Sequence, residues 1–185
     1  MINDIINEAR DKMKATLHVF QDELNGIRGN RASVALVDRL VVDYYGQPTE
    51  LRQLANISTP EAMQILIRPY DNGAVKDIER AIQQSDIGIM PNTDGANIRL
   101  NMPPLTRERR MDLVKFLHKR MEENRVAIRN IRRGANKDLG EFEDEGMISE
   151  DEKSRGEDEI QKLTDDHIKK IDDLGKAKEA DIMEI

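Results

Sequence analysis

Apolar residues recur at every third or fourth position in three long stretches of the chain, a spacing that places them on one side of an α-helix. The stretches cover residues 2–28, residues 106–146, and a region that opens with Ser149-Glu-Asp-Glu152. Gly26 and then Gly29-Asn30 predict the end of the first helix, because glycine frees the backbone for non-helical angles. Thr106 predicts an N-cap for the second helix, and Ser149 with Glu152 predicts a capping box for the third.

Two polar residues fall on the apolar sides of these helices. Asn124 lies on the seam of the second helix and His167 on the seam of the third. We interpret Asn124 as a polar seam residue of the kind that fixes the register of packed helices. His167 is interpreted as an interior histidine whose hydrogen bonds are satisfied. Together the three seams predict one bundle that is split in the sequence.

The segment between the first two helices follows a different period, with short β-branched and alternating stretches. Its turns are predicted at Gly46-Gln47-Pro48, Asp71-Asn72-Gly73 and Asp94-Gly95. Its predicted elements are strands at Val37–Tyr45, Leu54–Ser58, Met63–Arg68 and Ala96–Met102, and one amphipathic helix at Val75–Gln84. These elements indicate a small, separate α/β domain.

The order of the elements predicts an α+β protein, an elongated and discontinuous three-helix bundle with a small β-rich α/β domain inserted into it. Residues 1–29 and 105–185 make the predicted bundle, and residues 30–104 make the inserted domain. Because only two segments of chain connect the domains, we expect a hinge between them. The predicted hinge residues are Gly29, Asn30, Arg31, Pro103, Pro104 and Leu105.

Charge is distributed unevenly along the chain, which has 185 residues and a formal net charge of −7. Residues 141–185 carry 17 acidic and 7 basic side chains, whereas residues 1–140 carry 19 acidic and 22 basic ones. At about 0.1 M salt only charges within about 10 Å act strongly on one another. A local basic surface can therefore bind a polyanion although the whole chain is acidic.

Composition excludes several classes of protein. The chain has no cysteine, which excludes disulfides and thiolate chemistry and suits a reducing compartment. It contains no run of about 18 apolar residues that would span a membrane. Its first residues lack the basic and apolar segments of a signal peptide. We therefore expect a cytoplasmic protein with no membrane partner.

The candidate functional surface is a set of basic residues on the second helix, here called the arginine row: Arg125, Arg129, Arg132 and Arg133. At about 100° per residue these side chains project from one side of the helix, while Ile128 and Ile131 point toward the core. Lys115, Lys119 and Lys137 extend the same side. Planar guanidinium groups on a rigid helix suit a repeating anionic target such as a phosphate backbone.

Two interpretations of the arginine row stay open on composition alone. One is nucleic-acid binding. The other is a solvated helix face with ion pairs inside the helix, which is the commoner case for basic helices. Glu122 lies near the row, but the other acids of this helix mostly face elsewhere.

No residue pattern predicts catalysis. His18, His118 and His167 are dispersed and lack the spacing of metal ligands. The chain has no glycine-rich phosphate loop, and its serines lack the context of a nucleophile elbow. Acid pairs such as Asp165-Asp166 point about 100° apart on a helix, which is typical of solvated surface. We expect a non-enzyme with no catalytic residue, metal, cofactor or small-molecule substrate.

Several segments, spread over almost the whole chain, resemble the signature segments of the ribosome recycling factor family and occur in that family's order. They are Tyr44-Tyr45-Gly46, Ser85–Gly88, Leu105–Arg110, Val126–Arg133 and Ile148–Glu152. The arginine-rich segment is the most specific of them. The resemblance agrees with the split bundle and the inserted domain that the periodicity predicts.

The resemblance implies a non-enzymatic translation factor with an L-shaped, tRNA-like outline. Such factors bind the large ribosomal subunit after peptide release and, with elongation factor G and GTP, separate the subunits for reuse. It also implies that Arg129 and Arg132 contact ribosomal RNA and that Arg28 and Arg31 match further basic positions. The expected rRNA-binding set is therefore Arg132, Arg129, Arg133, Arg125, Arg28 and Arg31. The protein is expected to act as a monomer.

The chain departs from the family pattern after the paired arginines and at the first crossing between the domains. Gly134 follows the paired arginines where the family usually has aspartate. The first crossing reads Arg28-Gly-Asn-Arg-Ala32 where the family usually has Arg-Thr-Gly-Arg-Ala. A glycine inside a helix costs up to about 1 kcal/mol relative to alanine. The loss of an acid makes the arginine row more positive.

Functions from two other classes compete with this interpretation. One is a helical-bundle interaction adaptor or holdase, for which the arginine row would be incidental; a ribosome-pelleting assay separates it from a translation factor. The other is a metal- or nucleotide-dependent enzyme, which the residue inventory disfavours. Binding of GTP or a divalent ion to the isolated chain would support that alternative.

Overall fold

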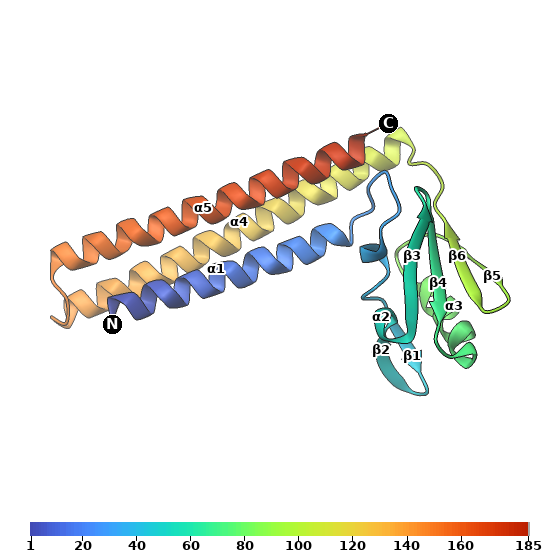
Figure 1. Ribbon diagram of the computed structural model, residues 1–185. Coiled ribbons are helices and arrows are strands. Elements are labelled where there is room, and N and C mark those ends of the chain that lie inside the picture. The colour runs from blue at the N-terminus through green and yellow to red at the C-terminus, as the bar shows by residue number, and fades with distance from the viewer. Residues whose placement is uncertain (185) are drawn as a thin grey trace. The chain divides into compact units, whose positions relative to one another are not determined.

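A computed structural model describes residues 1–184, which fall into two compact units (Figure 1). The first, here called the helical unit, comprises Met1–Leu24 and Asp112–Ala180. The second, the α/β unit, comprises Asn25–Met111 together with the residues from Asp181 onward. The predicted fold class is confirmed, since a long helical part accompanies a small part that contains the strands. The predicted domain limits and hinge stay a prediction.

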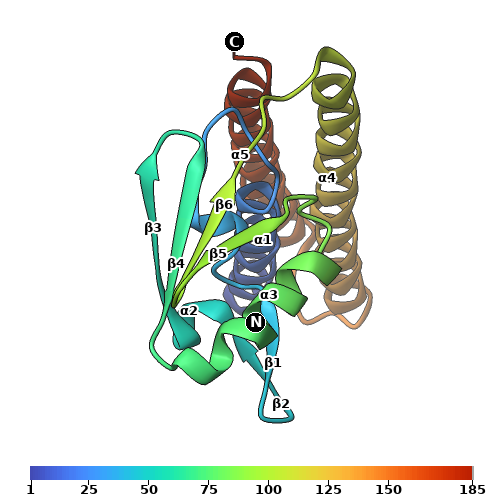
Figure 2. The ribbon, with the colours of Figure 1, turned by 90° about the vertical axis from the view of Figure 1, so that its right-hand side faces the viewer.

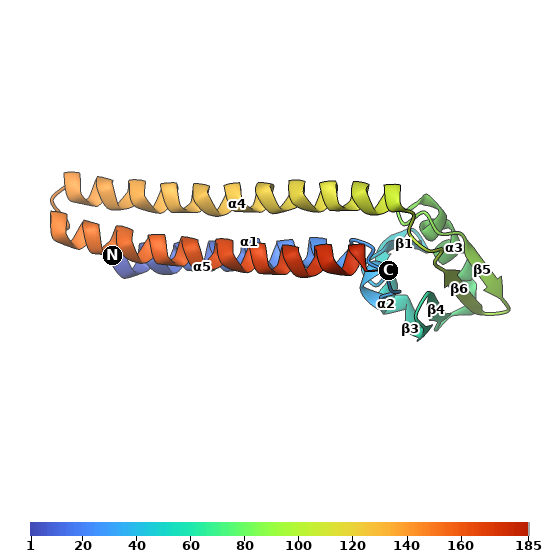
Figure 3. The ribbon, with the colours of Figure 1, turned by 90° about the horizontal axis from the view of Figure 1, so that it is seen from above.

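The helical unit consists of long helices that lie side by side, as Figures 1 and 3 both show. They are α1 (Ile2–Asn25), α4 (Arg107–Asp144) and α5 (Glu150–Met183). Their apolar seams meet in a buried cluster to which every one of these helices contributes: Ile5, Ile6, Ala9, Ala135, Leu139, Ile148 and Ile160. The segments that the sequence separates therefore share one core.

The predicted start signals of the later helices are confirmed. The Thr106 hydroxyl accepts a hydrogen bond of 3.1 Å from the Arg109 amide and so caps α4. Before α5, the Ser149 amide donates to the Glu152 carboxylate at 2.8 Å, and the Glu152 amide donates to the Ser149 hydroxyl at 3.3 Å. This reciprocal pair is a capping box, and it satisfies backbone donors that have no partner inside the helix.

The connection between α4 and α5 turns at Gly146, as predicted. Gly146 has a φ of 69°, a left-handed conformation that a side chain disfavours. Its amide donates to the Glu143 carbonyl and the Met147 amide donates to the Phe142 carbonyl, both at 2.8 Å. These bonds form a Schellman motif that satisfies the last carbonyls of α4. The first helix ends at Asn25, directly before the predicted stop signal Gly26 and short of the predicted bound at residue 28.

Two glycines of α5 face large side chains of α4. A Cβ atom at Gly175 would lie 2.4 Å from the Met121 sulfur, and one at Gly156 would lie 3.0 Å from a methyl carbon of Leu139. A glycine costs helix stability because of its backbone entropy. At these two positions the missing side chain makes room for α4 to pack closely against α5.

The α/β unit contains a four-stranded antiparallel sheet with strand order β3-β4-β6-β5, which Figure 2 shows from the front. Its strands are β3 (Ala55–Glu61), β4 (Gln64–Pro69), β5 (Pro91–Asp94) and β6 (Asn97–Asn101). A separate hairpin pairs β1 (Val41–Tyr44) with β2 (Gln47–Glu50). The helices are α2 (Leu51–Leu54) and α3 (Val75–Gln84), with 3₁₀ turns at Val34–Leu36 and Asn72–Ala74.

This unit has a core of its own. Ile65 and Ile67 of β4 and Ile98 and Leu100 of β6 are fully buried. The α3 helix contributes its buried Ile78 and Ile82 to the same cluster. Alternation along β6 leaves Asn97, Arg99 and Asn101 on the other side, which is the pattern of a strand with one solvated face. The predicted strand and helix periods at these positions are confirmed.

The structure corrects several predictions inside the α/β unit. The predicted strand Val37–Tyr45 is shorter, because Val34–Leu36 forms a 3₁₀ turn that Ser33 caps before the chain turns into β1. The turn predicted at Gly46-Gln47-Pro48 lies one residue earlier, at Tyr45-Gly46, and Gln47-Pro48 begin β2. The elements β2, α2 and β5 were not predicted. The helix Val75–Gln84 has the predicted bounds.

The tip of the β1–β2 hairpin is held by specific contacts. Tyr45 and Gly46 both have positive φ, 49° and 81°, which matches the twist that a two-residue hairpin requires. The Asp71 carboxylate accepts hydrogen bonds from the Tyr44 hydroxyl and the Gly73 amide, each at 2.9 Å. These bonds lower the pKa of Asp71, the Gly73 amide having the largest effect. The hairpin is thereby tied to the turn that precedes α3.

Candidate nucleic-acid interface

The arginine row lies on the outer side of α4, because the same helical turns place Ile128 in the core. Ile128 is fully buried, whereas the side chains of Arg125 and Arg129 are 24% and 40% exposed. Arg132 is half-buried and Arg133 is exposed. None of the four arginines is buried as Ile128 is, and two of them, Arg125 and Arg132, reach toward α5.

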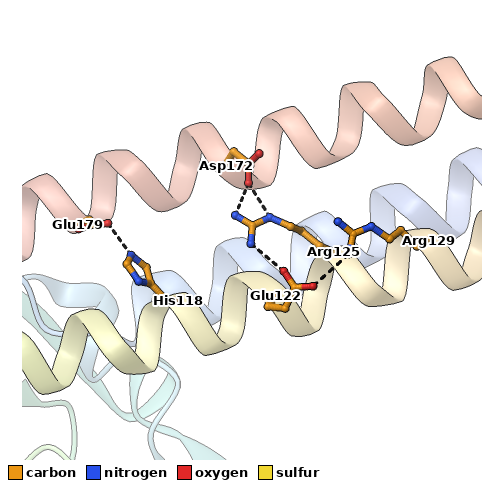
Figure 4. A network of polar contacts seen from close by, with 6 residues as sticks. All are labelled: His118, Glu122, Arg125, Arg129, Asp172 and Glu179. Atoms are coloured by element: carbon orange, nitrogen blue, oxygen red, sulfur yellow. Dashed lines mark hydrogen bonds and ion pairs between the residues drawn. The ribbon is translucent and has the colours of Figure 1, made fainter.

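Arg125 is the most firmly held member of the row, and Figure 4 shows its contacts. Its Nε and one terminal nitrogen donate to the same Asp172 oxygen of α5, at 2.8 and 2.6 Å. The other terminal nitrogen donates to Glu122 at 3.0 Å. Burial lowers the pKa of Arg125, but the hydrogen bonds to the two carboxylates raise it above its ordinary value. Arg125 thus joins α4 to α5 as well as lying in the row.

Glu122 connects Arg125 to Arg129. One of its oxygens accepts from Arg125, and the other accepts from an Arg129 terminal nitrogen at 3.1 Å (Figure 4). These bonds lower the pKa of Glu122, with Arg125 as the largest cause. The Glu122 side chain is 55% exposed and therefore stands in the row as a charged, solvent-accessible group.

Arg132 and Arg133 contact neutral groups. An Arg132 terminal nitrogen donates to the Gln161 amide oxygen on α5 at 2.9 Å, and Arg133 donates to the Asn130 amide oxygen at 3.4 Å. Within residues 1–184, neither guanidinium lies within 4.0 Å of a carboxylate oxygen. Their positive charge is therefore the least compensated of the arginine row.

The remaining basic residues near the row differ in their partners. His118 lies 2.8 Å from Glu179 of α5 (Figure 4). Lys137 pairs with Glu141 one turn along α4 at 3.3 Å. Ion pairs between exposed side chains such as these contribute little to stability, about 0–1 kcal/mol. They leave the charge of the lysine accessible to a stronger anion.

Arg28 and Arg31, the other predicted rRNA-binding residues, belong to the α/β unit. Arg31 is exposed. The Arg28 guanidinium donates to the Pro103 carbonyl, so it links the residue just before the first predicted hinge segment to the second segment. Burial lowers the pKa of Arg28, and the positive charges of Arg110 and Arg109 lower it further. These arginines form a second basic group, in which Arg109 and Arg110 were not predicted.

Gly29 belongs to the Arg28-Gly-Asn-Arg-Ala32 segment that departs from the family pattern, and the space beside its Cα is filled by another side chain. A Cβ atom there would lie 1.8 Å from a carboxylate oxygen of Asp181. Any larger residue at position 29 requires the Asp181 side chain to move. The unusual Arg-Gly-Asn sequence is thus matched to its surroundings in this chain.

The interior polar residues have the partners expected of structural groups. Asn124 is 8% exposed and donates to the Arg120 carbonyl at 2.8 Å and to Glu23 of α1 at 3.3 Å. His167 is 4% exposed, and its Nδ1 lies 2.7 Å from the Leu163 carbonyl. Residues 1–184 contain no group of three histidine, aspartate or glutamate side chains arranged to hold a metal ion. Within the same range, no helix is long and apolar enough to span a bilayer.

Comparison with known proteins decides the family. The ribosome recycling factor family model matches residues 20–183. Ribosome-recycling factors of Geobacillus sp. (strain WCH70) and Carboxydothermus hydrogenoformans are 50% and 51% identical over 185 residues, which is the full length of each chain. The chain belongs to the ribosome recycling factor family.

Solved structures of this family have the same fold. A solution structure of the ribosome recycling factor has a TM-score of 0.82 and 44% identity, and the match covers 100% of this chain and 98% of that one. A second structure contains the T. thermophilus ribosome recycling factor and the E. coli elongation factor G bound to the E. coli post-termination complex. Its TM-score is 0.70 at 42% identity, with 99% of each chain covered.

The family resemblance drawn from the signature segments is therefore confirmed, as is the expectation of a non-enzymatic translation factor. The RNA-binding role of each arginine and the hinge stay predictions. Asp172 and Gln161 of α5 were not predicted as the partners of Arg125 and Arg132. Their polar side chains beside the apolar seam of α5 indicate residues that could bond to a neighbouring helix. Position along α5 alone does not specify which arginine of α4 each of them contacts.

Proposed function

We propose that this recycling factor binds the large ribosomal subunit after termination through the arginine row of α4. The observation that carries the proposal is the pair Arg132 and Arg133, whose guanidinium groups lie on the outer side of a rigid helix and contact neutral amides. Guanidinium groups in this state can each grip a phosphate without first breaking an ion pair. The T. thermophilus relative bound to a post-termination complex supports this choice of partner.

The proposed outcome of binding is separation of the ribosomal subunits together with elongation factor G, which hydrolyses GTP. The same relative is bound with elongation factor G, and this supports the choice of the second partner. In this mechanism the recycling factor acts as a monomer and supplies a shaped, charged body, while its partner supplies the chemical energy. The proposed partner is the ribosome, so the proposed compartment is the cytoplasm.

The proposal also includes movement at residues 29–31 and 103–105, between a domain of residues 1–29 and 105–185 and one of residues 30–104. Two chain crossings with glycine and proline support it. Because the chain has no cysteine, dyes can be attached to cysteines introduced at Lys76 and Lys162. A broad distribution of single-molecule transfer efficiencies is expected. A single narrow efficiency, on the ribosome and off it, would contradict a hinge.

The binding experiment is co-sedimentation with purified large ribosomal subunits, comparing wild type with Arg132→Ala over a series of salt concentrations. Wild-type affinity should fall with a log–log slope of about −0.7 to −0.9 for each phosphate neutralised. Arg132→Ala should bind weakly and with a shallower slope. Arg155→Ala is the matched control, because Arg155 is an exposed arginine of α5 outside the row.

The outcomes separate the competing functions. Saturable, salt-sensitive binding that Arg132→Ala loses and Arg155→Ala retains supports the ribosomal role. Equal binding by all variants, or binding by none, would contradict it and favour an interaction adaptor with an incidental basic face. A light-scattering assay of subunit separation with elongation factor G and GTP then tests the second step.

A further inference from the structure

The members of the arginine row differ in how far carboxylates compensate their charge. Arg125 bonds to two carboxylates, Arg129 shares one of them, and Arg132 and Arg133 bond to amides. Charge compensation therefore decreases along α4 in the direction of its C-terminus. The member in the middle of this series, Arg129, is the one whose availability depends on a single residue, Glu122.

The position of Glu122 is fixed from one side. Arg125 is anchored by two hydrogen bonds to Asp172, and its third bond goes to one Glu122 oxygen. That bond turns the other Glu122 oxygen toward Arg129. A carboxylate held in this way presents anionic acceptor oxygens to a guanidinium, as a phosphate does.

The contact between Glu122 and Arg129 is nevertheless easy to exchange. Both side chains are accessible, 55% and 40% exposed, and their contact is one hydrogen bond of 3.1 Å. Exposed pairs of this kind contribute little, because water screens the charges and two long side chains must be ordered. Arg125 by contrast is 24% exposed and has three charged hydrogen bonds.

We propose that Glu122 is an internal competitor for Arg129, which occupies its guanidinium in the free protein and must be displaced when a phosphate of ribosomal RNA binds. This inference rests on the proposed function. Glu122 lowers the affinity of the arginine row and shortens the lifetime of the complex, as a factor that leaves the ribosome after each round requires. Arg125 and Asp172 act as positioning residues that hold the competitor in place.

The decisive experiment is a double-mutant cycle with Glu122→Gln, Arg129→Ala and the double variant, measured as the dissociation constant for purified large ribosomal subunits at about 0.1 M salt. Glu122→Gln keeps the size of the side chain and removes its charge. We expect it to tighten binding by roughly 1.4- to 5-fold, the range that corresponds to an exposed ion pair. Most of the gain should appear as slower dissociation.

Two comparisons make this expectation specific. In the Arg129→Ala background, Glu122→Gln should change the dissociation constant little, because the residue that it competes for is absent. Glu123→Gln is the matched control, since Glu123 lies next to Glu122 and has the same charge but pairs with Arg120 at 2.9 Å and with Lys119 at 4.0 Å, and with no member of the arginine row. Any general gain from removing one negative charge would appear equally in the control.

The results that overturn the inference are distinct from those that overturn the proposed function. Equal tightening with and without Arg129, or by Glu123→Gln, would mean that only overall charge matters. Weaker binding by Glu122→Gln would mean that Glu122 orients Arg129 for the RNA. If Arg132→Ala loses binding while Glu122→Gln has no effect, the proposed ribosomal role is supported, but the inference that Glu122 competes for Arg129 is wrong. If Arg132→Ala binds like wild type, both fall.

Discussion

The helical unit and the α/β unit differ in how far a surface residue can change without disturbing the structure around it. In α4 the core residue Ile128 and the surface residue Arg129 are neighbours in sequence but point in different directions, so the surface can change without touching the core. In the α/β unit, the Asp71 carboxylate binds both the Tyr44 hydroxyl of the β1–β2 hairpin and the Gly73 amide, and the hairpin turn requires positive φ at Tyr45 and Gly46. A long helix is thus the freer place for a binding surface to vary.

This comparison predicts that the two units can be destabilised separately, and the largest effect is expected in the cores. Ile67 is fully buried in the middle of β4, between β3 and β6. Ile67→Ala should lower the free energy of unfolding of the α/β unit by about 2–5 kcal/mol, because it leaves a cavity. All three tyrosines lie in this unit and the chain has no tryptophan, so tyrosine fluorescence during urea unfolding reports on it.

The control for Ile67→Ala is Leu139→Ala, which removes a fully buried side chain of α4. It should shift the unfolding transition seen by helical circular dichroism and leave the tyrosine transition in place. Identical shifts of both signals by both variants would show that the units unfold as one, and the comparison would fail.

The second prediction concerns the capping box that opens α5. Ser149→Ala removes the hydroxyl that accepts from the Glu152 amide. Loss of an N-cap costs about 0.5–2 kcal/mol, so the helical circular dichroism transition should move to lower urea while the tyrosine transition stays. Ser154→Ala, a change at an exposed serine inside the same helix, is the control and should have no such effect.

The same cap predicts a pH dependence. The Ser149 amide and hydroxyl lower the pKa of Glu152 below its ordinary value of 4.5. A lowered pKa in the folded state means that the ionised carboxylate stabilises the fold above pH 4.5, and that this contribution is lost as pH falls through the lowered pKa. The stability difference between wild type and Glu152→Gln should therefore be full at pH 7 and shrink below pH 4.5. A difference that does not change with pH would contradict the assignment.

A smaller effect is expected from the glycines of the long helices. Gly134 has no atom within 4 Å of an added Cβ, so Gly134→Ala should raise the free energy of unfolding of the helical unit by up to about 1 kcal/mol. Gly175→Ala gains the same helix propensity but displaces Met121, and should not stabilise. An equal rise in melting temperature for both variants would show that Met121 can move aside, so that α5 does not need a glycine at position 175 to pack on α4.

The smallest expected effect on stability is that of Arg132→Ala. Its guanidinium contacts Gln161 at the surface, so the free energy of unfolding should change by less than about 0.5 kcal/mol. Arg125→Ala should cost more, because it breaks the hydrogen bonds to Asp172 that join α4 to α5. If Arg132→Ala were the more destabilising change in urea unfolding, the surface would not be separable from the core.

Secondary structure was predicted more accurately from the sequence in the helical unit than in the α/β unit. The long helices were predicted because each presents many turns of one period, with Thr106, Gly146 and Ser149 marking limits that the structure confirms. In the α/β unit, β2 and β5 are four residues each and mainly polar, so they carry no alternation that predicts a strand. They form because a neighbouring strand supplies their hydrogen-bond partners.

For the candidate site, the position of the arginines on the helix could be predicted from the sequence, but their bonding partners could not. The spacing of Arg125, Arg129, Arg132 and Arg133 fixes their common direction, because the helix that carries them is regular. Their differing charge compensation depends on Asp172 and Gln161, which belong to another helix and reach the row through tertiary packing. Such pairings between distant segments do not follow from the periodicity of one sequence.

The order of the elements in the chain also determines when each can find its partners during synthesis. The turn at Gly146 makes α4 and α5 neighbours in sequence as well as in space, so they can pair quickly once both have been made. The buried Ile5 and Ile6 of α1 are synthesised first, yet their partners Leu139 and Ile160 are made near the end. Throughout that interval α1 exposes an apolar seam whose partner helices have not yet been made, and exposed apolar surface of this kind favours association between chains.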